Sequence, residues 1–202
     1  MDRGQSKEYT LLTVPTLLVF LALGYALGSL PVAYLVARSR GVDIFHVGTG
    51  NPGAANVFRK VGRGAGVAVV LGDAGKSVIP VAVAQWAGAS WWVALAVGVA
   101  AMVGRWYPVY LRFRGGVGLA PAIGASYALM TLPCLVATPA ALIVLYLSKS
   151  VAVAAVTWYA LVLVSALLLG QPLSLVLAVT GLPVLALVRH YLLPTLGERS
   201  TR

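Results

Sequence analysis

Residues 11–36 read LLTVPTLLVFLALGYALGSLPVAYLV and contain no charged side chain. A helix that crosses a membrane needs about 20 apolar residues, at a rise of about 1.5 Å each. The apolar core of a secretory signal peptide is shorter, about 7–15 residues. Further apolar runs follow as far as Val188, so a cleaved signal with a soluble mature domain does not fit. We therefore expect residues 11–37 to span a membrane.

The composition of the whole chain is that of a membrane protein. Of its 202 residues, 60% are hydrophobic and 10% are charged, whereas soluble domains carry about 25% charged residues. A soluble domain of this size has too little interior for so much apolar surface. We therefore expect an all-α, polytopic membrane protein in which residues 1–202 form one integral membrane domain.

The reactive and charged residues exclude several classes of protein. The single cysteine, Cys134, excludes an internal disulfide framework. Two histidines, one cysteine and five acidic residues are too few for a convincing metal site, so we expect no bound metal. The net charge is +10, but the basic residues cluster between the apolar segments. This placement favours topology signals and anionic headgroups or phosphates, with the lipid bilayer as the partner and not nucleic acid.

Seven apolar segments are candidate membrane helices. The fourth and fifth are short and are divided by Pro133, so an alternative interpretation is one re-entrant pair. A transporter is disfavoured, because no symmetry between halves is visible and the charges lie mainly at the segment ends. The seven segments are residues 11–37, 66–84, 86–104, 117–133, 134–148, 151–169 and 172–188.

The distribution of basic residues predicts the orientation. Seven crossings place the two termini on opposite sides of the membrane. With the N-terminus outside, twelve basic residues fall on the cytoplasmic side and only Arg3 and Lys7 fall outside, as the positive-inside rule prefers. Lys76 lies within a segment and is left out of this count. We therefore expect a cytoplasmic C-terminus. The twelve are Arg38, Arg40, Arg59, Lys60, Arg63, Arg105, Arg112, Arg114, Lys149, Arg189, Arg199 and Arg202.

The polar segment at residues 41–66 reads GVDIFHVGTGNPGAANVFRKVGRGAG. Its glycines allow a tight turn with exposed N–H groups. Asn51 is a good helix N-cap and Pro52 suits the first helical position, so we expect a short interfacial helix from Pro52 to about Val61 that ends at Gly62. Such a turn is a candidate anion site, although a flexible loop that only fixes topology explains it equally well. The candidate phosphate-binding residues here are Gly48, Thr49, Gly50, Asn51, Gly53, Asn56 and Arg59.

A second polar segment, residues 104–120, reads GRWYPVYLRFRGGVGLA. Arginines precede glycines before an apolar helix, an arrangement that offers guanidinium and N–H groups to an anion. The aromatic residues of this segment suit the interfacial aromatic belt. The candidate phosphate-binding residues here are Arg112, Gly115, Gly116 and Gly118.

Asp73 and Lys76 lie inside an apolar segment, three residues apart on one helical face. Ionisable residues are costly within a membrane, so each is a candidate functional residue. A mutually neutralising pair near the helix end is an equally good explanation. Arg189 and His190, at the end of the last apolar segment, taken alone are an ordinary basic pair at a membrane edge.

Together these segments resemble the PlsY family of bacterial acyl-phosphate:glycerol-3-phosphate acyltransferases. The first signature of that family, G-S-x-P followed by G-S-G-N-x-G-A-x-N-x-x-R and D-x-x-K, is similar to residues 28–76. The second signature of the family, G-H-x-F-P-x-x-x-x-F-x-G-G-K-G, is similar to residues 104–118. Arg189 and His190 stand where the family has the motif H-R-E-N near its C-terminus.

The resemblance implies a multi-pass protein of the bacterial inner membrane that takes part in phospholipid synthesis. It implies that an acyl phosphate donates its acyl chain to glycerol 3-phosphate on the cytoplasmic side, giving lysophosphatidate without a metal or cofactor. No protein partner follows from it. The catalytic candidates on the matching positions are Ser29, Asp73, Lys76, Arg105 and His190.

The chain also departs from the family pattern. Arg105 stands where the second signature has His, and Val117 stands where it has Lys. Tyr191, Leu192 and Leu193 replace the R-E-N of the C-terminal signature. These departures leave open an alternative, a catalytically degenerate paralogue that binds a lipid phosphate or a partner protein.

Overall fold

The structure is a computed structural model that describes residues 13–192, and this part of the chain is helical with no strand. The expected all-α fold is therefore confirmed. The elements are α1 (Val14–Gly28), α2 (Val32–Arg38), α3 (Ala54–Lys60), α4 (Arg63–Trp86), α5 (Trp91–Trp106), the 3-10 helix η1 (Val109–Leu111), α6 (Leu119–Leu129), α7 (Thr131–Ser148), α8 (Val151–Leu168) and α9 (Leu173–Leu192).

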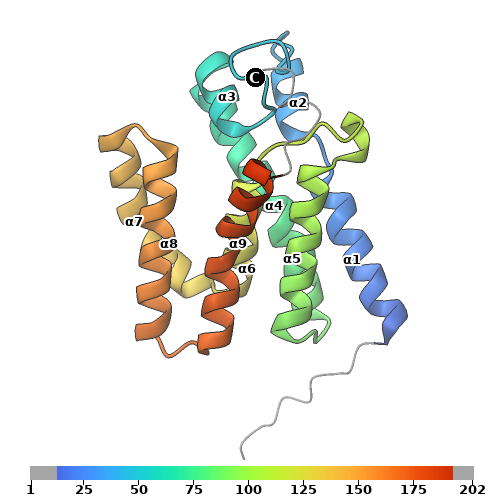
Figure 1. Cartoon of the computed structure of the whole chain (residues 1–202), viewed down its shortest axis with the longest axis vertical. Coiled ribbons are helices and arrows are strands. Elements are labelled where there is room, and N and C mark those ends of the chain that lie inside the picture. The colour runs from blue at the N-terminus through green and yellow to red at the C-terminus, as the bar shows by residue number, and fades with distance from the viewer. Residues whose placement is uncertain (1–12, 193–202) are drawn as a thin grey trace, which may run out of the picture.

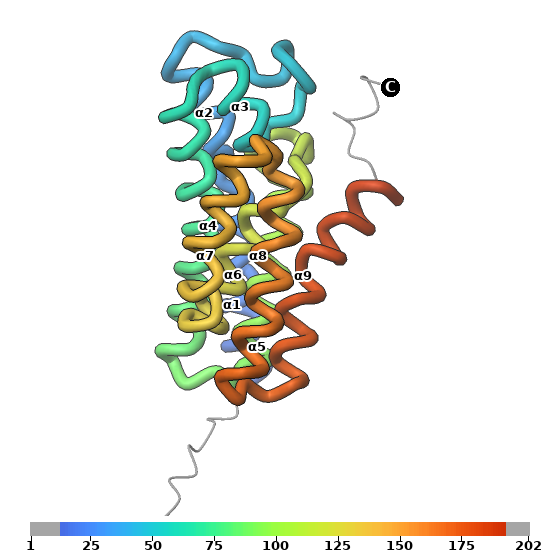
Figure 2. Tube along the Cα trace, turned by 90° about the vertical axis from the view of Figure 1, so that its left-hand side faces the viewer, coloured from blue at the N-terminus to red at the C-terminus, as the bar shows by residue number. Residues whose placement is uncertain are grey.

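Six stretches of the described chain are long and apolar enough to cross a membrane. They are α1 with α2 as one span, then α4, α5 (with η1), α7, α8 and α9. The seventh expected span, residues 117–133, is represented by α6, which has 11 residues and is about 16 Å long. Most of the long helices run along one axis of the molecule, α7 and α8 form a hairpin at one side, and the C-terminal part of α9 leans away from the bundle (Figures 1 and 2).

The division between the fourth and fifth segments falls at Met130, not at Pro133. Met130 has φ −138° and ψ 66°, which ends α6 and begins α7. Pro133 lies in the first turn of α7, where a missing N–H costs nothing because that group has no helical acceptor. The chain therefore turns between two helices of unequal length at this point.

The first span is broken between α1 and α2. Pro31 is the residue before α2, and its ring and missing N–H prevent a continuous helix through Ser29 and Leu30. Below the break, α1 packs closely on α5. A Cβ atom on Gly28 would lie 2.1 Å from the carbonyl oxygen of Ala101, so only glycine permits this approach. The break places main-chain carbonyls of residues 28–30 against α4 and α5.

Apart from Lys76 inside α4, the described basic residues lie toward the end of the bundle that holds α2 and α3 (Figure 1). The connections at the other end, residues 87–90 and 169–172, carry no charged side chain. Arg3, Lys7, Arg199 and Arg202, which entered the charge argument, lie outside the described residues. The outer helices expose large apolar side chains, for example Leu142, Tyr146 and Leu147 on α7, as expected for a surface that faces lipid.

A small apolar cluster holds the basic end together. Ala33 and Ala37 of α2, Ile44, Val57 of α3 and Val69 of α4 are all buried in it. The cluster fixes the segment between α2 and α4 on the end of the bundle, so the polar residues of that segment are held over the broken first span.

Candidate active site

Asp73, Lys76 and Arg105 form a buried charge cluster between α4 and α5. Lys76 Nζ lies 2.7 Å from Asp73 Oδ1, and Arg105 Nε lies 3.2 Å from Asp73 Oδ2. Their exposed fractions are 2% for Asp73 and 5% for each cation. Asp73 is ten residues into α4, about 15 Å along the helix axis. The cluster holds two cations and one carboxylate, a formal charge of +1. Asp73 and Lys76 lie well inside α4, while Arg105 is in the last turn of α5.

Lys76 is tied to the break in the first span. Its Nζ donates to the main-chain carbonyl of Leu30 and, at 3.4 Å, to that of Gly28. These carbonyls accept no N–H from a continuing helix, because α1 ends at Gly28. The hydroxyl of Ser29 donates to the carbonyl of Tyr25 at 2.8 Å, so it too supports the end of α1. The cationic Lys76 lies at the negative end of the α1 dipole, a favourable placement.

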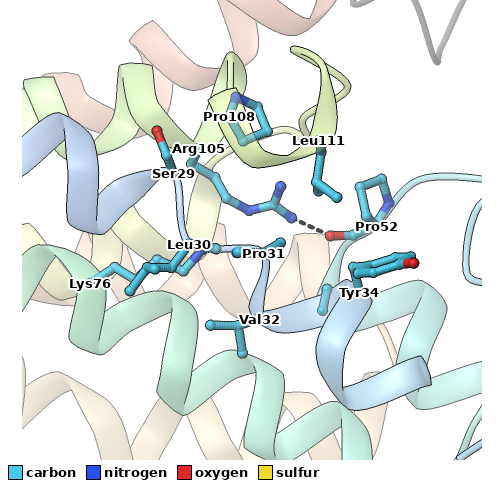
Figure 3. A pocket seen from close by; sticks show the side chains of 11 residues that line it. Ser29, Leu30, Pro31, Val32, Tyr34, Pro52, Lys76, Arg105, Pro108 and Leu111 are labelled. Atoms are coloured by element: carbon cyan, nitrogen blue, oxygen red, sulfur yellow. Dashed lines mark hydrogen bonds between the residues drawn. The ribbon is translucent and has the colours of Figure 1, made fainter. Parts of the chain in front are cut away.

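Arg105 joins the cluster to the two polar segments. A terminal nitrogen of its guanidinium donates to the carbonyl of Pro52 (Figure 3). Its own carbonyl accepts from the N–H of Gly116 at 3.3 Å. We call residues 48–53 the first glycine loop and residues 112–118 the second glycine loop. Both loops therefore form a hydrogen bond with the same residue of α5, Arg105.

The first glycine loop is shaped by Asn56. Its side-chain nitrogen donates to the carbonyls of Val47 at 2.9 Å and Asn51 at 3.1 Å. Its side-chain oxygen accepts from the N–H of Thr49 at 3.3 Å. Gly48 has φ +60°, and a Cβ atom there would lie 2.2 Å from this oxygen. Asn56 is 2% exposed, so its amide stabilises the loop from within.

The short helix begins later than the sequence predicts. Its N-cap is Gly53 and its first residue is Ala54, so the expected Asn51 cap with Pro52 in the first turn is wrong. Pro52 is buried and its carbonyl is engaged by Arg105, which holds it outside the helix. Thr49 and Gly50 donate their N–H groups within this segment, to Asn56 Oδ1 and to the Val47 carbonyl. Arg59 is exposed on α3 and does not line the pocket described below.

The second glycine loop packs tightly on the end of α5. A Cβ atom on Gly115 would lie 2.1 Å from the carbonyl oxygen of Trp106. The indole N–H of Trp106 donates to the carbonyl of Val117 at 2.7 Å. Arg114 stacks on Phe45, with 4.6 Å from its guanidinium carbon to the ring centroid, and so ties this loop to the segment before the first loop. Arg112 is exposed and has φ 51°.

The C-terminal basic pair reaches the end of α5. Arg189 is 4% exposed, and its guanidinium carbon lies 5.2 Å from the ring centroid of Tyr107. His190 is half-buried and meets the ring of Tyr191 edge-on at 5.2 Å. His190 does not line the pocket. The departure at Leu193 lies outside the described residues.

A small pocket that is open to solvent lies beside the charge cluster (Figure 3). The broken first span forms one wall, while Pro52 and Leu111 lie opposite. Of the sequence candidates, Ser29, Lys76 and Arg105 line it, and Asp73 contacts the two cations. The hydroxyl of Ser29 is turned back toward α1. The structure thus unites four of the five catalytic candidates and leaves His190, Arg59 and Arg112 outside the pocket.

Sequence reasoning missed three features of this site. It treated Arg189 only as part of a basic pair, since nothing in the sequence says which of two adjacent residues turns inward. It missed Tyr25, whose hydroxyl donates to the carbonyl of Tyr107 at 2.9 Å and ties α1 to the end of α5. Tyr34, which lines the pocket, carries no signal in an apolar helix. Within residues 13–192, no three His, Cys, Asp or Glu side chains come together as a metal site would require.

The fold and the site define a polytopic helical membrane protein with a buried cationic cluster beneath two glycine loops. Residues 18–192 match the family model described as glycerol-3-phosphate acyltransferase, and the chain belongs to that family of acyltransferases. The resemblance to PlsY proteins is confirmed. The comparisons give no support to a catalytically degenerate paralogue.

Three curated relatives named glycerol-3-phosphate acyltransferase illustrate the similarity. The protein of Endomicrobium trichonymphae is 35% identical over 174 residues, which is 86% of this chain and 87% of the relative. The protein of Pseudomonas paraeruginosa is 39% identical over 83% of this chain and 88% of the relative. That of Rubrobacter xylanophilus is 53% identical over 107 residues, about half of either chain (53% and 54%).

Two crystal structures of PlsY, an integral membrane glycerol 3-phosphate acyltransferase, share the fold. The glycerol 3-phosphate form has a TM-score of 0.75 at 30% identity and covers 87% of this chain and 88% of its own. The lysophosphatidic acid form has a TM-score of 0.74 at 30% identity, covering 86% and 87%. The shared fold and the family match agree over nearly the whole described chain.

Proposed function

We propose that this chain transfers the acyl group of an acyl phosphate to glycerol 3-phosphate and releases lysophosphatidate and inorganic phosphate. The family match and the similarity to PlsY support an acyltransferase that acts on glycerol 3-phosphate. The single observation that carries the proposal is the buried Asp73–Lys76–Arg105 cluster, which brings a net positive charge beneath two glycine loops.

The chemistry suits such a site. An ester bond forms between a glycerol 3-phosphate hydroxyl and the acyl carbon, and the bond from that carbon to the phosphate oxygen breaks. Both substrates carry phosphate, so their mutual repulsion must be offset by fixed positive charge and oriented donors. An acyl phosphate is already activated, so positioning can supply much of the catalysis without a covalent enzyme nucleophile.

The residues divide into two proposed groups. The first group lies beneath the two glycine loops and supports the site. It consists of Asp73, Lys76, Arg105 and Ser29 at the break. Arg59 and Arg112 are exposed at the same end of the bundle, where guanidinium groups suit bidentate phosphate contacts. The glycines of the two loops allow the main chain to approach a substrate. Asn51, Thr49 and His190 remain candidates for substrate contact.

The basic end is proposed to face the cytoplasm of a bacterial cell, with the protein in the inner membrane and its N-terminus outside. The placement of the described basic residues at one end supports this orientation through the positive-inside rule. A cytoplasmic site would be accessible to the water-soluble acceptor, glycerol 3-phosphate. The apolar outer surface of the helices would contact the bilayer that contains the acyl donor.

The decisive experiment is an assay of the purified protein in lipid nanodiscs. Palmitoyl phosphate and glycerol 3-phosphate are supplied, and both phosphate release and radiolabelled lysophosphatidate are measured. We expect both products in equal amounts, and loss of both in Asp73→Asn. Phosphate release without lysophosphatidate would indicate hydrolysis and would contradict the proposed transfer. Product formed from an acyl thioester, but not from palmitoyl phosphate, would contradict the proposed donor.

A further inference from the structure

Arg105 contacts three separate parts of the site. Its Nε donates to Asp73 Oδ2 on α4 at 3.2 Å, and a terminal nitrogen donates to the Pro52 carbonyl in the first glycine loop. Its main-chain carbonyl accepts from the N–H of Gly116 in the second glycine loop at 3.3 Å. The side chain and the main chain of one residue therefore hold different loops.

The two loops meet at this guanidinium. A Cβ atom on Gly116 would lie 2.8 Å from the terminal nitrogen of Arg105 and 2.8 Å from Asn51 Oδ1. The main chain of the second loop thus lies close to both the arginine and a side chain of the first loop. Arg105 is 5% exposed, so water does not compete for these contacts.

We propose that Arg105 is a positioning residue that holds the two glycine loops at a fixed separation and anchors the first of them on Asp73. The consequence for catalysis rests on the proposed function, but the structural role does not. Because the guanidinium presents donors in a rigid fork, it can serve Asp73 and Pro52 in different directions at once. A lysine is a point charge on a flexible stem and can keep only one of these contacts well.

The histidine that the PlsY signature has at this position would hold the loops differently. A neutral imidazole offers one donor and one acceptor, so it cannot donate to both a carboxylate and a carbonyl. The arginine adds a permanent cation and a second donor. It therefore couples the first glycine loop to the charge cluster in this chain without any need for protonation.

The first test measures hydrogen exchange of the full-length protein in nanodiscs without substrate. Arg105→Gln and Arg105→Lys are compared with Arg40→Gln, which makes the same change at an exposed arginine of the same end. We expect amides of residues 48–53 to exchange about tenfold faster in Arg105→Gln, the size expected for loss of one hydrogen bond to a charged group. Residues 114–118 should show a smaller increase, because they lose the packing of the guanidinium against Gly116 but keep the bond from its N–H to the main-chain carbonyl of residue 105. Arg105→Lys should show a smaller increase, and Arg40→Gln none. Exchange in α8 serves as the internal reference and should not change.

The second test is kinetic. In Arg105→Gln we expect the KM for glycerol 3-phosphate to rise about tenfold, with a smaller fall in kcat, because the acceptor must then order both loops itself. Faster exchange in only one loop, or in neither, would overturn the proposal, as would a uniform increase that includes α8. A loss of activity with unchanged exchange would mean that Arg105 acts directly on substrate, which also overturns it. If the unmodified protein transfers no acyl group, the proposed function fails, while the exchange result still decides the role of Arg105.

Discussion

Lys76 on α4 donates a hydrogen bond from its Nζ to the main-chain carbonyl of Leu30, at the point where the first span is not helical. Carbonyls inside a membrane have no water to bind, so a broken helix is tolerated only where protein groups satisfy them. Asp73, at 2.7 Å, balances the charge of the same ammonium group. The break between α1 and α2 and the charge cluster between α4 and α5 therefore stabilise each other.

This relationship predicts that Lys76→Met destabilises the protein strongly. The substitution removes the ammonium donor from the carbonyls of Gly28 and Leu30, of which Leu30 keeps only the N–H of Val32 at 3.0 Å, and it takes one of two cations from buried Asp73. Removing one partner of a buried ion pair typically costs about 3–5 kcal/mol. Thermal unfolding in detergent, with Lys149→Met at an exposed site of the same end as the control, measures the effect.

A double-substitution cycle separates the two contributions. Asp73→Asn in the Lys76→Met background should lower the stability further, because Arg105 is then a buried cation without its carboxylate. A double variant as stable as Lys76→Met alone would show that the Asp73–Arg105 pair contributes nothing. A stability of Lys76→Met equal to that of Lys149→Met would refute the dependence between break and cluster.

Asn56→Ala is expected to loosen the first glycine loop while the membrane helices stay intact. It removes the side-chain donor from the carbonyls of Val47 and Asn51, which keep only the N–H groups of Gly50 and Gly53, and it leaves the N–H of Thr49 without its acceptor. An unsatisfied buried group costs about 1–3 kcal/mol, which corresponds to roughly 5- to 150-fold faster amide exchange when exchange requires local opening. The amides of residues 47–57 report this directly.

Ser39→Ala is the control for Asn56→Ala, because it removes one exposed hydrogen bond, to the carbonyl of Val36, at the same end of the molecule. It should leave the exchange of residues 47–57 unchanged. Equal exchange in the two variants would mean that the apolar cluster around Ile44 and Val57 alone holds the loop.

The helices could be predicted because hydropathy alone carries that signal. A run such as residues 151–169 has no alternative to a buried helix, and α8 occupies Val151–Leu168. The break at Ser29–Pro31 could not be placed, because a proline in a membrane helix often only kinks it. The 11-residue length of α6 was also hidden, since Val117 and Gly118 are compatible with either a helix or a loop.

The site was predictable as a set of residues but not as an arrangement. Asp73 and Lys76 are three apart, so helix geometry alone places them on one face. Arg105 is 32 positions beyond Asp73, and its pairing depends on how α4 and α5 pack. The role of Asn56 was equally hidden, because an amide that binds its own loop and an amide that binds a phosphate look the same in a sequence.

Gly115→Ala is expected to abolish most of the acyl transfer. The added Cβ would lie 2.1 Å from the carbonyl oxygen of Trp106 and 2.3 Å from that of Arg105, so the second glycine loop must move away from α5. Gly64→Ala is the matched control, because a Cβ there meets nothing within 4 Å. Alanine in the first turn of α4 should be neutral or stabilise by up to about 1 kcal/mol. Wild-type kcat/KM in Gly115→Ala would show that the loop can shift freely.

Reporter fusions test the orientation. Fusions after Arg63 and Arg114 should both report the cytoplasm, and a fusion after Gly170 should report the opposite side, since the bundle carries its basic residues at the end that holds α2 and α3. A fusion at the C-terminus should again report the cytoplasm. A periplasmic signal after Arg63 would reverse the proposed orientation and would place the pocket away from the cytoplasm.

Val117→Lys is expected to raise acyl transfer. Val117 stands in the second glycine loop where the PlsY signature has Lys, and its carbonyl is held by the indole N–H of Trp106 at 2.7 Å. Because this main-chain contact does not involve the side chain, the loop should keep its place when the side chain changes. Its side chain is half-buried, so an ammonium group on a longer stem can reach the solvent-facing side of the loop.

A charged hydrogen bond to a substrate phosphate contributes about 1.5–3 kcal/mol, so kcat/KM in Val117→Lys should rise roughly 10- to 150-fold. Val117→Met, of similar length but uncharged, is the control and should leave kcat/KM within about twofold. Raising the salt concentration should reduce the gain, since the added charge is near solvent. Arg105→His in the Val117→Lys background should lower kcat/KM again, because a neutral imidazole cannot donate to both Asp73 and the Pro52 carbonyl. A further rise in that double variant would instead show that this chain has lost activity at both signature positions and that Arg105 contributes nothing the histidine cannot.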